Sequence, residues 1–251
     1  MIINNNKLFL YLLSFAALFA LWQILSLLIG SEVLPSPIPV VLAFFVELTK
    51  SDFWQNTYSS LFRILGGLGL AFITAVPFGL LLGSSPKLDK WFSPIIYISY
   101  PIPKIILLPV ILLLFGLGNL SKIILIAIIV FFQLLITTRD SARLIDNNIK
   151  YSFKSLGGSK IQYFNHVVWP ATLPGVYTSL RIGTGTAVAV LFFVESISAR
   201  SGLGMYIIDA WGRADYISMF VGMLALSLIG IMLYELFDLL EKISCKWKSI
   251  I

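Results

Sequence analysis

Long apolar runs without a charged residue recur along this chain, and no other feature constrains its fold as strongly. The first of them, Leu8–Ile29, contains 22 residues. A helix of this length rises about 33 Å, and the hydrocarbon core of a bilayer is about 30 Å thick. A secretory signal carries an apolar segment of only about 7–15 residues. We therefore interpret Leu8–Ile29 as a retained first membrane span.

Five further apolar runs follow the first. Because only helices and closed barrels satisfy their backbone polar groups in lipid, uninterrupted runs of this length predict helices. The sequence predicts an all-α polytopic membrane protein with about six transmembrane helices, in one transmembrane domain covering residues 1–251. The five runs are Ile64–Gly83, Trp91–Gly116, Ile123–Thr138, which is short and should extend into its flanks, Ala171–Val194 and Ile217–Tyr234.

Composition supports a membrane location and argues against nucleic acid as a partner. Apolar residues make up 58% of the chain and charged residues 12%, whereas soluble domains average about 45–50% and about 25%. Lipid must therefore cover part of the apolar surface. The net charge is +6, but the basic residues lie between apolar runs and form no stripe interleaved with aromatics. The single cysteine, Cys245, cannot form an internal disulfide.

The loop charges predict which side of the membrane each loop occupies. With both termini in the cytoplasm, eleven basic residues lie on the inner side and four on the outer side, which satisfies the positive-inside rule. We therefore expect a multi-pass protein of the bacterial plasma membrane. The inner residues are Lys7, Lys87, Lys90, Arg139, Arg143, Lys150, Lys154, Lys160, Lys242, Lys246 and Lys248, and the outer ones are Lys50, Lys122, Arg200 and Arg213.

Small residues recur every four positions in two of the predicted spans. Such spacing lets helix backbones approach closely in a membrane. Packing within one bundle is the favoured explanation, and a seam between two copies is the alternative. The stripes are Gly67, Ala71, Ala75, Gly79 and Gly83 in one span, and Gly175, Ser179, Gly183 and Ala187 in the other.

The span Trp91–Gly116 is interrupted by four prolines, Pro94, Pro101, Pro103 and Pro109. Each proline removes a helix hydrogen bond or bends the axis. Broken helices occur in membranes where they are buried in protein or line a cavity. This segment is therefore a candidate for the lining of a transport pathway, and a kinked structural helix is the alternative.

Four charged residues lie at or inside the predicted spans and, with Pro103 and Pro109, complete the pathway candidates. A charged group there is costly unless it is paired or hydrated. We expect Glu195 to lie near a cation of its own chain, with Arg200 nearest in sequence, or to serve as a gate. We expect Lys104 to face the bundle interior or a water-filled route rather than lipid, near carbonyls that the neighbouring prolines free and that could solvate it. A snorkelling or structural role is the alternative. The remaining two candidates are Arg63 and Arg181.

The stretch 147–170 between the fourth and fifth spans predicts a cytoplasmic helix–turn–helix. Gly157 follows a short helical segment, as glycine does where a helix ends in the left-handed conformation. Ser159 and Gln162 form a capping box for a second helix. We expect Pro170 to stop that helix before the fifth span. Such a segment could dock into a groove of a partner or lie on the membrane surface.

The same stretch resembles the EAA loop of the permeases of binding-protein-dependent ABC importers. In that loop Glu-Ala-Ala is followed by Gly and then by Ile-x-Leu-Pro, and Gly157, Val167 and Pro170 occupy matching positions. Trp169 replaces the family's Leu. Other stretches resemble the nitrate, sulfonate and taurine branch, in order: Leu34-Pro35-Ser36-Pro37, Ser60-Leu61-Phe62-Arg63, Pro101-Ile102-Pro103 with Pro109, Phe115-Gly116-Leu117-Gly118, Glu195, and Gly202-Leu203-Gly204.

The resemblance implies a type I importer transmembrane domain with a core permease region at about 57–241. In that family two permeases work as a pair, here a homodimer. They convert the ATP-driven closure of cytosolic ABC ATPase subunits into a change of access across the membrane. An extracytoplasmic binding protein delivers the solute. ATP then binds the partner ATPase, and this chain binds no cofactor or metal. Tyr151 stands where the family has Glu, so the ion pair of that Glu is not carried over. The residues implied in coupling are Tyr151, Phe153, Lys154, Leu156, Gly157, Ser159, Ile161 and Phe164.

Two other functions compete with an ATP-driven permease. An enzyme is disfavoured because His166 is the only histidine for a zinc site or a catalytic triad. A secondary carrier usually places acidic groups at mid-membrane, and the predicted spans contain none. The chain has no Gly-x-x-x-x-Gly-Lys-Ser/Thr phosphate loop, so an ATPase would be a separate chain. The solute stays open between an anion and a vitamin or pyrimidine precursor.

Overall fold

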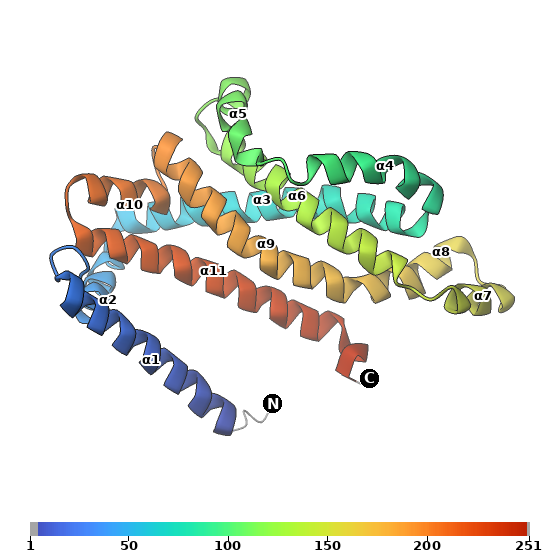
Figure 1. Cartoon of the computed structure of the whole chain (residues 1–251), viewed down its shortest axis with the longest axis horizontal. Coiled ribbons are helices and arrows are strands. Elements are labelled where there is room, and N and C mark those ends of the chain that lie inside the picture. The colour runs from blue at the N-terminus through green and yellow to red at the C-terminus, as the bar shows by residue number, and fades with distance from the viewer. Residues whose placement is uncertain (1–4, 250–251) are drawn as a thin grey trace.

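The computed structural model describes residues 5–249, and every regular element among them is a helix (Figure 1). In chain order these are α1 (Asn5–Ile29), α2 (Pro37–Glu47), α3 (Ser51–Ser84), α4 (Pro86–Ser99), the 3₁₀ helix η1 (Lys104–Leu107), α5 (Leu108–Phe115), α6 (Asn119–Arg143), α7 (Asn147–Ser155), α8 (Lys160–Tyr163), the π-helix η2 (Phe164–Val168), α9 (Trp169–Ser198), α10 (Leu203–Gly212), α11 (Tyr216–Ser244) and the 3₁₀ helix η3 (Lys246–Ser249).

Four long helices, α3, α6, α9 and α11, form the bundle, and α6 packs between α3 and α9 (Figure 1). Fully buried apolar side chains such as Ile64, Leu134 and Leu191 form its core. In lipid this core is stabilised by van der Waals packing, because the hydrocarbon outside is as apolar as the core itself. Each of the four predicted spans Ile64–Gly83, Ile123–Thr138, Ala171–Val194 and Ile217–Tyr234 lies within one of these helices.

The described residues contain four helices that are long and apolar enough to span a membrane. A bent pair of shorter helices makes a fifth span if the pair is counted as one. The four are Ser51–Ser84, Asn119–Arg143, the continuous helix Lys160–Ser198 and Tyr216–Ser244. α1 is helical over the predicted first span. Its described apolar part, Leu13–Ile29, is shorter than the other spans, so the sixth crossing stays a prediction.

The glycine stripe of α3 packs against α6. A Cβ on Gly79 would come within 2.8 Å of Thr138, and one on Gly67 or Gly83 would overlap Ile126 or the Arg139 carbonyl oxygen. The backbones can approach this closely only because these positions carry no side chain. On α9, Gly175 and Gly183 approach α6 in the same way, against Ser141 and Val130. Packing within one bundle, the favoured explanation of both stripes, is confirmed.

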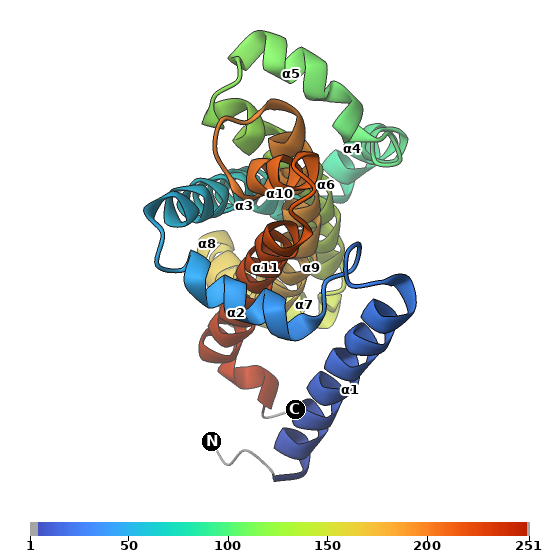
Figure 2. The same ribbon diagram turned by 90° about the vertical axis from the view of Figure 1, so that its left-hand side faces the viewer.

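The proline-rich span is broken as predicted. α4 ends at Ser99, and the pair Pro86–Ser99 and Lys104–Phe115 is bent by 81°. Pro103 directly precedes η1 and Pro109 lies in the first turn of α5, where the missing N–H costs no hydrogen bond. At the other end of α5, Gly116 has a φ of +71°. The broken helix covers one flank of α6 (Figure 2).

The expectation that Pro170 ends a helix was wrong. The helix that begins at Lys160 continues through η2 into α9, and Pro170 lies in the first turn of α9. The N–H of Trp169 donates to the carbonyl of Phe164, five residues back. A π-turn of this kind widens the helix and lets it absorb a proline, because the hydrogen-bond register shifts by one residue.

The first helix, α1, lies outside the bundle, whereas α2 packs against α11. α1 leans away from the bundle in both views (Figures 1 and 2) and meets α11 through Trp22, which stacks on Phe220 at 5.9 Å between ring centroids. The Trp22 indole N–H donates to the carbonyl of Pro35 at 3.0 Å. This bond fixes the turn between α1 and α2, in which Pro37 begins α2.

Candidate transport and coupling sites

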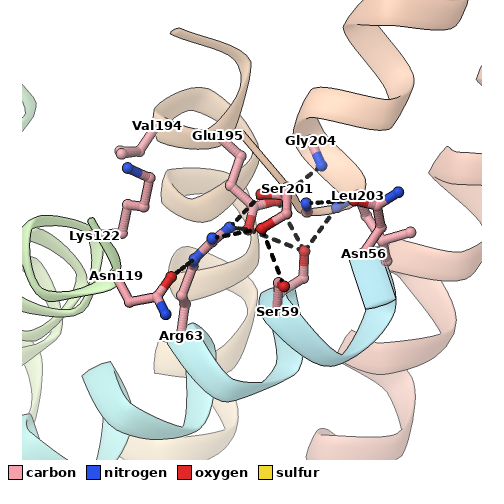
Figure 3. A network of polar contacts seen from close by, with 12 residues as sticks. Asn56, Ser59, Arg63, Asn119, Lys122, Val194, Glu195, Ser201, Leu203 and Gly204 are labelled. Carbon is pink, nitrogen blue, oxygen red and sulfur yellow. Dashed lines mark hydrogen bonds and ion pairs between the residues drawn. The ribbon is translucent and has the colours of Figure 1, made fainter. Parts of the chain in front are cut away.

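A buried ion pair joins α3 to α9 at one end of the bundle (Figure 3). Arg63 Nη1 donates to Glu195 Oε1 at 2.5 Å, and the two side chains are 4% and 0% exposed. Ser60, one turn before Arg63 on α3, donates its hydroxyl to Glu195 Oε2 at 2.8 Å. The backbone N–H of Gly204 donates to the same oxygen at 2.8 Å. The carboxylate is thus fully enclosed by donors.

Glycines let the chain pass this close to the carboxylate. Gly202 has a φ of +125°, and a Cβ there would overlap the Glu195 carboxyl group. A Cβ on Gly204 would lie 2.6 Å from the Glu195 Cβ. Leu203 between them donates its N–H to the Ser60 hydroxyl at 2.8 Å. The Gly-Leu-Gly motif therefore has a physical reason, since any side chain at either glycine would displace Glu195.

Arg63 also holds two connections in place (Figure 3). Its Nη1 donates to the Ser201 carbonyl at 2.6 Å, in the turn between α9 and α10. Its Nε donates to Asn119 Oδ1 at 2.9 Å, at the start of α6. One guanidinium therefore ties together α3, α6 and the α9–α10 turn, which rigidifies this end of the bundle.

Glu195 does lie near a cation of its own chain, but the cation is Arg63 and not Arg200. Arg200 lies just beyond the end of α9 and is exposed. The side chain that reaches the carboxylate comes from α3, which packs against α9 but lies far away in sequence. Proximity along the chain was the wrong guide here.

Lys122 is a second buried cation near this pair, and the sequence analysis missed it as a site residue. It is 0% exposed and donates to the carbonyl oxygens of Leu117 at 2.8 Å, Gly118 at 3.2 Å and Ser198 at 3.1 Å. These bonds join the α5–α6 connection to the end of α9. Its place in an expected outer loop concealed it, because loop charges are normally solvated.

Lys104 lies at the break of the proline-rich span and is half-buried. Its Nζ donates to the carbonyls of Ser99 at 2.7 Å and Tyr100 at 2.6 Å. The Ser99 carbonyl lacks its usual helical donor, because residue 103 is a proline. Nζ also lies 4.2 Å from the centroid of the Phe132 ring on α6. The expected solvation of Lys104 by freed carbonyls is confirmed, and its place in a transport pathway stays a prediction.

Arg181 on α9 pairs with carboxylates of α11. Its guanidinium contacts Glu241 and lies 3.4 Å from Asp238, so neighbouring carboxylates account for this cation. The pathway candidates therefore do not form a single site. Arg63 and Glu195 meet at one end of the bundle. Arg181 lies on α9 well before Glu195, away from that end. The helix break holds Pro103, Lys104 and Pro109.

The predicted helix–turn–helix is present between α6 and α9. Asp146 caps α7 by accepting the Asn148 N–H at 2.9 Å. Gly157 ends it with a φ of +79°. Ser159 accepts from the Gln162 N–H, and Gln162 Oε1 accepts from the Ser159 N–H at 2.9 Å, which completes the capping box. The glycine and the capping box thus predicted the turn between the two helices correctly.

Apolar side chains on this segment stay uncovered. Leu156 is 85% exposed, Ile161 73% and Tyr151 64%. Further along the second helix, Phe164 is 41% exposed and Val168 is buried. The tip of the helix–turn–helix therefore presents apolar surface that the described part of the chain leaves unpaired.

An ionic cluster ties the broken helix to the start of this segment. Asp89 on α4 accepts from Arg143 Nη1 at 2.8 Å and lies 3.3 Å from Arg139 Nε. Arg139, 1% exposed, donates from Nη2 to the Tyr97 hydroxyl at 2.8 Å. Arg143 is the last residue of α6, four residues before α7. The cluster thus fixes α4 next to the connection that leads into α7.

Comparisons with known proteins agree with this arrangement. The chain is 30% identical over 238 residues to a formylaminopyrimidine transport permease protein of Halalkalibacterium halodurans, covering 94% of this chain and 95% of that protein. It is 28% identical to a putative aliphatic sulfonates transport permease protein of Bacillus subtilis, over 93% of this chain and 86% of that one.

A solved structure shares the fold. It shows inward-facing conformations of the MetNI methionine ABC transporter, and one of its chains superposes with a TM-score of 0.65 at 20% identity, over 75% of this chain and 94% of that chain. The family model described as binding-protein-dependent transport system inner membrane component matches residues 75–245. With more than half of its length matched, the chain belongs to this family of inner-membrane permeases of ABC importers.

Proposed function

We propose that this permease couples solute import to a separate cytosolic ATPase through the segment 147–170. The observation that carries the proposal is the capped helix–turn–helix with uncovered apolar side chains at its tip. A rigid segment of this kind costs little ordering entropy when it docks. The coupling residues proposed here remain those of the EAA-like stretch, with Gly157 as the pivot between the two helices.

The rest of the assembly follows from the family. We place the coupling segment and both termini in the cytoplasm, as the loop charges indicate, and take residues 57–241 as the core permease region. A second copy of the chain would complete the pathway, and a binding protein would deliver the solute from outside. ATP would bind and be hydrolysed on the ATPase chain.

The names of the relatives point to small polar solutes of more than one class. They include permeases for formylaminopyrimidine, aliphatic sulfonates and riboflavin, and among the others are permeases for taurine and nitrate. Three of these five solutes carry an acidic or anionic group, and the other two are a pyrimidine and a vitamin. The proposed cargo is therefore a small anion or a vitamin or pyrimidine precursor, and ligand identification on the cognate binding protein would decide between them.

Gly157→Val tests the coupling assignment. A Cβ at this position would meet no atom within 4 Å, so the change acts only through the positive φ, which a β-branched residue adopts poorly. We expect normal membrane abundance, loss of co-purification with the ATPase and loss of ATP-dependent uptake.

Gly69→Val is the matched control. Gly69 lies within α3 and has a helical φ, and a Cβ added there would also meet no atom within 4 Å. This variant should leave ATPase binding and uptake near the wild-type values. Wild-type ATPase binding and transport by Gly157→Val would show that the coupling assignment is wrong.

A further inference from the structure

A cavity of about 420 Å³ lies between α7, α8 and the Ser84 end of α3. Its volume falls at the lower end of the range of ligand pockets, about 300–1,000 Å³. Phe153 and Tyr163 form an aromatic wall, with ring centroids 5.7 Å apart and an interplanar angle of 62°. A Cβ on Gly158 would overlap the Phe153 ring, so a glycine is needed for this wall to form.

Three lysines, Lys150, Lys154 and Lys160, line the same cavity. All three are exposed, and none has an ion-pair partner among residues 5–249. No Asp or Glu occurs between residues 147 and 170. The preceding acid in the sequence, Asp146, is used as the α7 cap. The cavity therefore combines an aromatic wall with three unneutralised amines.

We propose that this cavity receives an acidic side chain of the cytosolic ATPase subunit, an inference that rests on the coupling role proposed above. A carboxylate on an apolar stem fits the site, because the stem packs on the rings while the amines neutralise the charge. The three lysines make this surface basic, and a partner group of complementary charge is acidic. α7 projects past the ends of α3 and α4 (Figure 1), towards the side on which the ATPase would bind.

The test uses the full-length permease and its cognate ATPase, reconstituted in nanodiscs of phosphatidylcholine alone. We expect Lys154→Glu/Lys160→Glu to weaken ATPase binding about tenfold or more, since like charges placed together disfavour association strongly. Lys87→Glu/Lys90→Glu, on exposed positions in the first turns of α4 outside this cavity, makes the same charge change and should bind as wild type.

Carbodiimide cross-linking, which joins a lysine amine directly to a carboxylate, gives an independent readout. We expect cross-links from the three lysines to acidic residues of the ATPase. Lys154→Arg/Lys160→Arg keeps the charge and should keep the affinity while losing its cross-links. The cross-links of the wild type and the affinity of the arginine variant test the proposed contact even where the glutamate variant fails to fold.

The outcomes separate the inference from the coupling role. Wild-type affinity of the glutamate variant, or no cross-link to the ATPase, would overturn the inference and leave coupling standing. A charge effect seen only in nanodiscs with anionic lipid would assign the lysines to lipid headgroups and also overturn it. Failure of the wild-type permease to bind the ATPase would overturn both proposals.

Discussion

Removing one partner of the Arg63–Glu195 pair should destabilise the bundle, and removing both should cost less than the two single losses added together. With Glu195→Leu, the guanidinium keeps Ser201 and Asn119 but loses the only carboxylate that it bonds to within residues 5–249. Breaking a buried pair from one side costs about 3–5 kcal/mol, because the other charge stays buried without compensation. Arg63→Leu should cost a similar amount, with Glu195 left to Ser60 and Gly204.

The double variant Arg63→Leu/Glu195→Leu distinguishes a coupled pair from two independent side chains. Independent effects would add to about 6–10 kcal/mol, whereas contacting residues show coupling energies of about 0.5–3 kcal/mol. We therefore expect the double variant to be destabilised by about 0.5–3 kcal/mol less than the sum of the two single variants. The measurement is reversible unfolding in detergent micelles, compared across the four proteins of the cycle. Strict additivity would refute the buried pair as the origin of the stability at this end.

Three further predictions concern other parts of the chain. Lys104→Leu should reduce uptake while ATPase co-purification stays intact, because Lys104 lies at the helix break and far along the chain from the coupling segment; unchanged uptake in proteoliposomes would reduce it to a structural residue. Gly83→Val should destabilise the bundle by about 1–3 kcal/mol, measured by thermal unfolding in detergent, because its side chain would overlap the Arg139 carbonyl. Ser159→Ala should cost about 1 kcal/mol of local stability by loss of the cap, seen as faster amide exchange at Gln162, and Ser159→Thr should largely restore it.

The features that sequence reasoning found correctly are those set by neighbours within a few residues. A run of apolar residues specifies a membrane helix whatever surrounds it, because the backbone must satisfy itself in lipid. Gly157, the Ser159–Gln162 capping box and the prolines near Lys104 act through adjacent backbone groups. The family resemblance added the type of transporter, which the physical pattern alone left open.

The tertiary structure decided everything that depends on how the helices cross. Arg63 meets Glu195 across 132 residues, and no local signal ranks it above Arg200. Lys122 is buried and bonds to the Ser198 carbonyl only because the end of α9 lies beside it. Pro170 lies in a continuous helix because a π-turn forms just before it. Which side chains of different helices meet depends on the rotation and depth of each packed helix. Rotation and depth are set by close contacts between helices, such as Gly79 against Thr138, and the sequence of one helix alone does not reveal them.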